Sequence, residues 1–95
     1  MSKGCARVNA KRDANEKDIV EVLEKRGFNV ERVSAPGFPD LVVSKNGSAW
    51  FVEVKRPKGT FTQAQLEFRT RWQGPKPWTL RSVEDALRFP NVGPE

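Results

Sequence analysis

Two acids and a lysine lie in the most apolar part of this 95-residue chain. Asp40 opens one run rich in β-branched residues, and Glu53 and Lys55 alternate with valines at the end of the next run. The pair Asn46-Gly47 separates the two runs, and such a pair between strands predicts a β-hairpin with a two-residue turn. Carboxylates held together beside an amine form a cluster that can bind a divalent cation.

The two-residue turn fixes which residues face each other across the hairpin. The numbers of facing residues then have a constant sum, which places Asp40 directly opposite Glu53. Facing Cβ atoms are about 5 Å apart, and like charges at that separation destabilise a sheet, so we expect a cation between the acids. Lys55 lies two residues after Glu53, hence on the same face of its strand. Mg²⁺ bound there could activate water for hydrolysis of a phosphodiester.

Each of these three residues also has an ordinary structural explanation. Asp40 could cap a turn, Glu53 could be a solvated strand residue, and Lys55 could form a surface ion pair of little energetic value. The combination of opposed acids, apolar flanks and a lysine on the same face favours the cation site.

Composition restricts the chemistry that such a site can use. The chain has 17 basic and 12 acidic residues, and its net charge of +5 favours a polyanionic partner. It contains no His and no Tyr, which excludes a histidine base, a histidine ligand and a tyrosine nucleophile. Its single Cys5 has no disulfide partner. No apolar run approaches 18 residues and no signal-peptide core is present, so we expect an intracellular, cytoplasmic protein.

The rest of the sequence predicts the elements that position the three residues. In chain order these are a helix over 13–26, a strand over 28–33, the two hairpin strands, a helix from 62 to 74, a strand over 78–81 and a short helix over 82–89. The helix between the third and fourth strands makes a crossover, so these two strands should be parallel. We predict an α/β mixed sheet in the order α-β-β-β-α-β-α. A flexible basic arm over 1–12 precedes a single domain over 13–89, and 90–95 forms a tail.

Two polar residues at helix starts have competing interpretations. Glu16 follows Asp13 by three residues, the spacing of a capping box, but it could also point along the buried helix face toward the sheet; the pattern alone favours the cap. Gln65 fits as the box partner of an N-cap at Thr62, ahead of an apolar side formed by Leu66, Phe68 and Trp72 and with Phe61 and Leu66 as a hydrophobic staple.

The residues around the predicted site resemble a known group of nucleases. Pro39-Asp40 followed by Glu53-Val54-Lys55 is similar to the PD-(D/E)xK nuclease signature, and the predicted order contains that superfamily's restriction-endonuclease-like core. From about Asp13 to Leu87 the chain more narrowly resembles a compact form of the virus-type replication-repair nuclease (VRR-NUC) group, through Asn15-Glu16, Gly37-Phe38-Pro39-Asp40, Glu53-Val54-Lys55, Thr62 with Gln65, and Phe68.

This resemblance implies a role for each matching residue. Asp40 and Glu53 would bind Mg²⁺ or Mn²⁺, joined by the carbonyl of Val54. Glu16 would reach the same metal directly or through water, which reverses the preference for a cap. The catalytic lysine would be Lys55, and Gln65 would face the site, although the interpretation of Gln65 as the capping-box partner of Thr62 is equally good.

The same resemblance implies a metal-dependent, structure-selective DNA endonuclease of DNA repair or replication, acting as a homodimer in a bacterial or phage-infected cell. Candidate phosphate contacts are the basic residues Arg56, Lys58, Arg69, Arg71, Lys11 and Arg12. Two alternatives stay open, namely a catalytically silent DNA-binding module of the same fold and a four-way-junction resolvase.

Overall fold

In the computed structural model, residues 14–91 are described and form one mixed sheet with three helices. The elements in chain order are α2 (Ala14–Lys25), β1 (Asn29–Arg32), β2 (Leu41–Lys45), β3 (Ser48–Val54), α3 (Gln63–Arg71), β4 (Trp78–Leu80) and α4 (Val83–Arg88). The predicted order α-β-β-β-α-β-α is confirmed. The predicted basic arm and residues 92–95 of the predicted tail lie outside the described residues.

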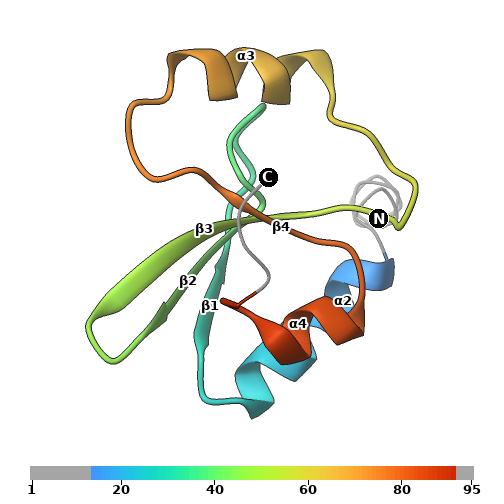
Figure 1. The fold of residues 1–95 in the computed structure, drawn as a ribbon, viewed down its shortest axis with the longest axis vertical. Coiled ribbons are helices and arrows are strands. Elements are labelled where there is room, and N and C mark those ends of the chain that lie inside the picture. Colours follow the sequence, from blue (N-terminus) through green and yellow to red (C-terminus); the bar gives the residue numbers. More distant parts are fainter. Residues whose placement is uncertain (1–13, 92–95) are drawn as a thin grey trace, which may run out of the picture.

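The strands lie side by side in the order in which they occur in the chain. β1, β2 and β3 pair antiparallel, whereas β4 pairs parallel to β3, as the crossover through α3 predicts. Figure 1 shows α2 and α4 next to each other at one end of the molecule and α3 at the other end. The start of β2 and the end of β3 therefore point toward α3.

The hairpin has the predicted turn and the predicted register. Asn46 and Gly47 both have positive φ angles, 52° and 86°, as a tight two-residue turn between twisted strands requires. Lys45 pairs with Ser48, and the ladder continues to the pair of Leu41 with Val52. One further step along the same register places residue 40 opposite residue 53.

Helix α2 ends at Lys25, one residue before the predicted end, and the predicted left-handed turn at Gly27 follows it. Gly27 has a φ of 92° and its N–H donates to the carbonyl of Glu24, while the N–H of Phe28 donates to the carbonyl of Leu23. These two bonds satisfy the last helical carbonyls in a left-handed turn that glycine adopts without strain. The chain is thereby turned directly into β1.

The main core lies between the sheet and the pair α2 and α4. Alternate residues of β2 and β3 point into it, and α2 contributes residues spaced three and four apart. Its buried members are Ile19, Val20, Leu23, Phe28, Leu41, Val43, Val52, Val54, Leu80, Ala86 and Phe89. The opposite face of the sheet is thus left for α3.

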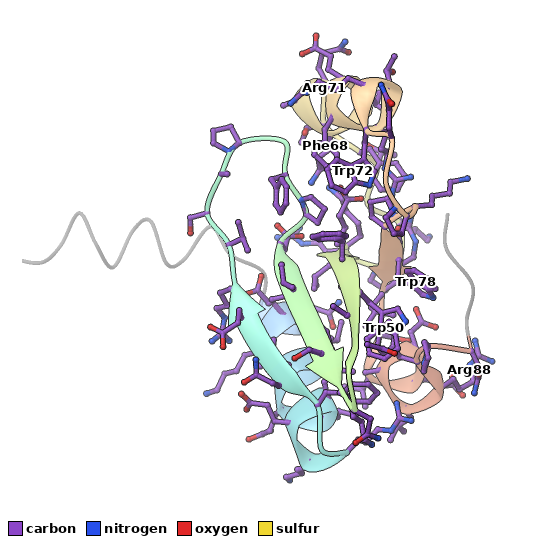
Figure 2. All side chains as sticks on the ribbon, turned by 90° about the vertical axis from the view of Figure 1, so that its left-hand side faces the viewer. Trp50, Phe68, Arg71, Trp72, Trp78 and Arg88 are labelled. Carbon is purple, nitrogen blue, oxygen red and sulfur yellow. The ribbon has the colours of Figure 1, made fainter. Side chains whose placement is uncertain are left out.

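A smaller aromatic cluster joins α3 to that second face. Its members are Phe38, Phe51, Phe68 and Trp72, and Figure 2 shows Phe68 and Trp72 between α3 and the strands. The expected place of Leu66 in this apolar side is wrong, because Leu66 is 46% exposed. Residues two apart lie about 200° apart around a helix, so Leu66 cannot share a face with Phe68.

The end of α3 also differs from the prediction. The helix ends at Arg71 and not at Gly74, because Trp72 leaves the helical conformation (φ −72°, ψ 126°) while its N–H still bonds the carbonyl of Phe68. The indole packs back on the aromatic cluster, and this packing ends the helix three residues before the glycine.

The loop before β2 requires glycine at position 37. Gly37 has a φ of 77°, and a Cβ atom there would lie 2.7 Å from the carbonyl oxygen of Ala64 in α3. We expect Gly37→Ala to lower the free energy of unfolding by about 2–3 kcal/mol, from left-handed strain and this overlap together. Urea denaturation followed by tryptophan fluorescence measures the loss.

Gly47→Ala provides the matched control. Its φ of 86° is similarly left-handed, but nothing lies within 4 Å of an added Cβ atom. Only the backbone strain, about 1 kcal/mol, should then be lost. Equal losses in the two variants would show that the approach of the loop to α3 does not matter for stability.

Candidate active site

Asp40 is fixed against the end of β3. It precedes β2 by one residue, and its Oδ2 accepts a hydrogen bond of 2.8 Å from the N–H of Val54. Its own carbonyl accepts from the N–H of Val33, also at 2.8 Å. Because Val54 follows Glu53 directly, the carboxylate of Asp40 lies at the same end of the hairpin as Glu53.

Glu53 is a fully buried acid with one cationic partner. Its Oε1 accepts a hydrogen bond of 2.7 Å from Nη2 of Arg69, while no donor in the described part of the chain reaches its Oε2. A buried carboxylate is costly unless it is paired, and removal of one partner of such a pair is strongly destabilising. The free, buried Oε2 is an acceptor available to a water molecule or a cation.

Lys55 and Gln65 connect the strand to the start of α3. The Nζ atom of Lys55 donates to Oε1 of Gln65 at 2.6 Å, and the same oxygen accepts the N–H of Thr62 at 2.9 Å. The N–H of Gln65 in turn donates to Oγ1 of Thr62, so the predicted capping box is present. Gln65 therefore caps α3 and contacts Lys55 with a single oxygen.

Arg69 is the residue of this site whose role was not recognised in the sequence. We expected it to contact DNA phosphate from the surface, but its side chain is only 15% exposed and is paired with Glu53. Gln65 and Arg69 are four residues apart on one helix face, and they meet Lys55 and Glu53, which are two apart on one strand face. That match of helical and strand spacings was the signal available in the sequence.

The ring of Phe61 lies against both cations of the site. Its centroid is 4.1 Å from Cζ of Arg69 and 5.5 Å from Nζ of Lys55. Phe61 was predicted to form a staple with Leu66, which is exposed instead. Cations over an aromatic face are attracted to it, so Phe61 helps to hold both side chains beside β3.

Asn15 ties the start of α2 to the same region. Its Nδ2 donates to the carbonyls of Lys55 and Arg81, each at 3.0 Å. Arg81 in turn donates from Nη1 to the carbonyl of Gly59 at 2.8 Å and to that of Arg56 at 3.0 Å. These bonds hold the backbone of the loop that follows β3, while the basic side chains of this loop are exposed to solvent.

Glu16 is buried nearby but has a different partner. Its Oε2 accepts a hydrogen bond of 2.9 Å from Nε of Arg32. Asp13, its partner in the predicted capping box, lies outside the described residues. Within residues 14–91 no three acids or cysteines come together in a group that could hold a metal ion. The structure thus places Asp40 beside Glu53 and does not bring Glu16 into a three-acid set with them.

The other basic candidates lie on the surface near the site. Arg56 and Lys58 are exposed in the loop after β3, and Arg71 is exposed on α3, where Figure 2 labels it. Lys11 and Arg12 lie outside the described residues. None of the helices in residues 14–91 has the length and apolar character needed to cross a membrane.

Comparison with known proteins identifies one family. A family model described as archaeal Holliday junction resolvase (Hjc) matches residues 7–68, more than half of the chain, and this stretch contains Asp40, Glu53 and Lys55. The family is a member of the PD-(D/E)xK superfamily, so the broader resemblance seen in the sequence is confirmed, whereas the narrower resemblance to the VRR-NUC group is not shown. No curated protein and no solved structure gives a match.

Proposed function

The chain belongs to the archaeal Holliday junction resolvase family, and on this premise we propose that it cuts four-way DNA junctions by metal-dependent hydrolysis of phosphodiester bonds. The family consists of structure-selective endonucleases, which agrees with the activity expected from the sequence and favours the resolvase alternative. The observation that carries the proposal is the meeting of Asp40, Glu53 and Lys55 at one end of the hairpin, inside the matched region.

Asp40 and Glu53 fit a divalent cation such as Mg²⁺ or Mn²⁺. Asp40 comes directly before Leu41, which pairs with Val52, so it lies at the same end of the hairpin as Glu53, and Oε2 of Glu53 is buried with no donor among the described residues. Hard cations of this kind use one or two carboxylates and fill their other positions with water and phosphate oxygens. The carbonyl of Val54 could add a ligand, and Glu16 could reach the ion through water. When bound, the ion would polarise the scissile phosphate and acidify an attacking water.

The protein's own contribution is to orient a positive charge beside these acids. The hydrogen bond to Gln65 fixes the ammonium group of Lys55, and the helix cap fixes Gln65. An ammonium group held in place before the reaction can stabilise the negative charge that grows on the phosphate, or orient the attacking water. The exposed side chains of Arg56, Lys58 and Arg71 would contact phosphates of the DNA.

We propose that the active form is a homodimer. Resolution of a four-way junction needs one incision in each of two strands, and a chain of 95 residues with one such site can supply only one at a time. Two copies related by a two-fold axis would present two sites to a substrate of the same symmetry. Light scattering of the purified protein, alone and with a junction, should give the mass of two copies.

A panel of DNA substrates tests the proposed activity. Four-way, flapped, nicked and linear DNA are incubated with the full chain in Mg²⁺, Mn²⁺ or EDTA, and we expect four-way junctions to be cut in either metal but not in EDTA. The Arg69–Glu53 pair favours one rival, a silent DNA-binding module in which Glu53 is purely structural. Tight junction binding with no cutting in either metal would support that rival.

A further inference from the structure

Arg69 lies between the buried acid Glu53 and a hollow at the end of α3. Its Nη2 bonds Glu53, and its side chain also lines a hollow of about 190 Å³ together with Trp72, Gly74, Lys76 and Pro77. The Oγ1 atom of Thr79 lies 3.4 Å from the same Nη2. Arg69 therefore contacts the proposed metal ligand and also lines an open hollow.

The charge of Arg69 should oppose metal binding at Glu53. The buried carboxylate has a positive partner already, at 2.7 Å. A divalent ion at the same carboxylate would lie within a few ångströms of the guanidinium group, and two cations at that distance repel each other strongly in a partly buried site. Metal at the second oxygen of Glu53 is therefore bound more weakly while Arg69 keeps its contact with the first oxygen.

The hollow could hold another anion to which Arg69 binds. Two of its lining residues, Arg69 and Lys76, are basic, and among the described residues that line it none is acidic. Its volume equals that of about six water molecules, enough for a phosphate group. Arginine and lysine are the side chains that hold DNA phosphates, and arginine can do so with two parallel hydrogen bonds.

We propose that this hollow binds a backbone phosphate of the DNA and that Arg69 shifts from Glu53 to this phosphate, which frees Glu53 for the metal ion. The inference rests on the proposed function, because it takes Glu53 as a metal ligand and DNA as the substrate. Arg69 is then a positioning residue that couples the two binding events. Such coupling is reciprocal, so metal strengthens DNA binding by the same factor by which DNA strengthens metal binding.

The first test measures Mn²⁺ affinity without DNA, by electron paramagnetic resonance of the free ion. Arg69→Met removes the competing charge and should bind Mn²⁺ about ten-fold more tightly than the unchanged chain. Arg69→Lys keeps the charge and should stay closer to the unchanged chain. Arg88→Met removes an equal charge on α4, far from α3 in Figure 2, and should change the affinity less than two-fold. Loss of the partner of a buried acid lowers stability, so thermal melting of each variant sets a temperature at which all of them are folded, and the affinities are compared there.

The second test measures junction affinity by fluorescence anisotropy, with every protein carrying Lys55→Met to keep the DNA intact. Mn²⁺ in place of EDTA should tighten binding about ten-fold, and by less than three-fold once Arg69→Met is added. Lys76→Met should weaken junction binding several-fold and leave the DNA-free Mn²⁺ affinity unchanged.

The outcomes separate this inference from the proposed function. A chain that binds Mn²⁺ and cuts junctions, but in which Arg69→Met binds Mn²⁺ no more tightly, overturns the inference alone. Unchanged junction affinity in Lys76→Met overturns the phosphate site in the hollow. A chain that binds no Mn²⁺ and cuts no junction overturns both the inference and the proposed function.

Discussion

Lys55→Met is expected to slow the cleavage of four-way junctions by about 10³-fold while the fold stays intact. The lysine is partly exposed, and its ammonium group bonds only the Gln65 side chain among the hydrogen bonds described for it. Methionine keeps the length and the apolar stem of the side chain and removes the positive charge. Loss of a positioned charge or proton-transfer group costs about 10²–10⁴ in rate. Single-turnover cleavage of a labelled junction, with protein in excess, measures the chemical step.

The matched control for this experiment is Lys25→Met. Lys25 is an exposed lysine in the last turn of α2, so its replacement changes the net charge equally. Its cleavage rate should stay within a factor of two or so of the unchanged chain, as for most exposed positions away from a site. If Lys55→Met retained more than a tenth of the rate, the lysine would act only by binding DNA, and the proposed mechanism would be wrong.

The parts of this fold that could be predicted from the sequence are those set by local chemistry. An Asn-Gly pair adopts positive φ angles easily, so the hairpin turn and the register from Lys45 opposite Ser48 to Leu41 opposite Val52 could be predicted from two residues. Thr62 and Gln65 are three apart in the chain, and their capping box was equally visible. In both cases the interacting groups are near neighbours in sequence, and tertiary packing has little freedom to change the result.

The ion pairs of the site could not be predicted in this way. Arg69 meets Glu53 and Arg32 meets Glu16, and in each pair the partners are 16 residues apart on different elements. Local patterns do not specify such contacts; they depend on how α3 and β1 are placed against the rest. Glu16 and Glu53, which the resemblance implies as metal ligands, are thus each paired with an arginine in this structure. Metal binding must compete with arginine at both positions.

Asp40 is the informative position for testing metal binding. Its Oδ2 accepts the backbone N–H of Val54 at 2.8 Å, a contact that an uncharged amide oxygen can also make. We expect Asp40→Asn to lower Mn²⁺ affinity at least ten-fold and junction cleavage by about 10³-fold, because the amide group carries no charge for the cation. The amide oxygen can still accept the N–H of Val54, so the free energy of unfolding should change by less than about 1 kcal/mol.

Two further variants separate the role in metal binding from the role in the fold. Asp40→Ala removes the acceptor as well, leaves the N–H of Val54 without that partner, and should cost about 1–3 kcal/mol of stability. Asp18→Asn removes an equal charge from an exposed position on α2 and should leave affinity and cleavage unchanged. Full Mn²⁺ affinity in Asp40→Asn would show that the metal does not bind between the two facing strands. Reduced Mn²⁺ affinity of Asp40→Asn at unchanged stability would identify Asp40 as a metal ligand. The fold requires only an oxygen that accepts the N–H of Val54, whereas the cation requires the negative charge of the carboxylate.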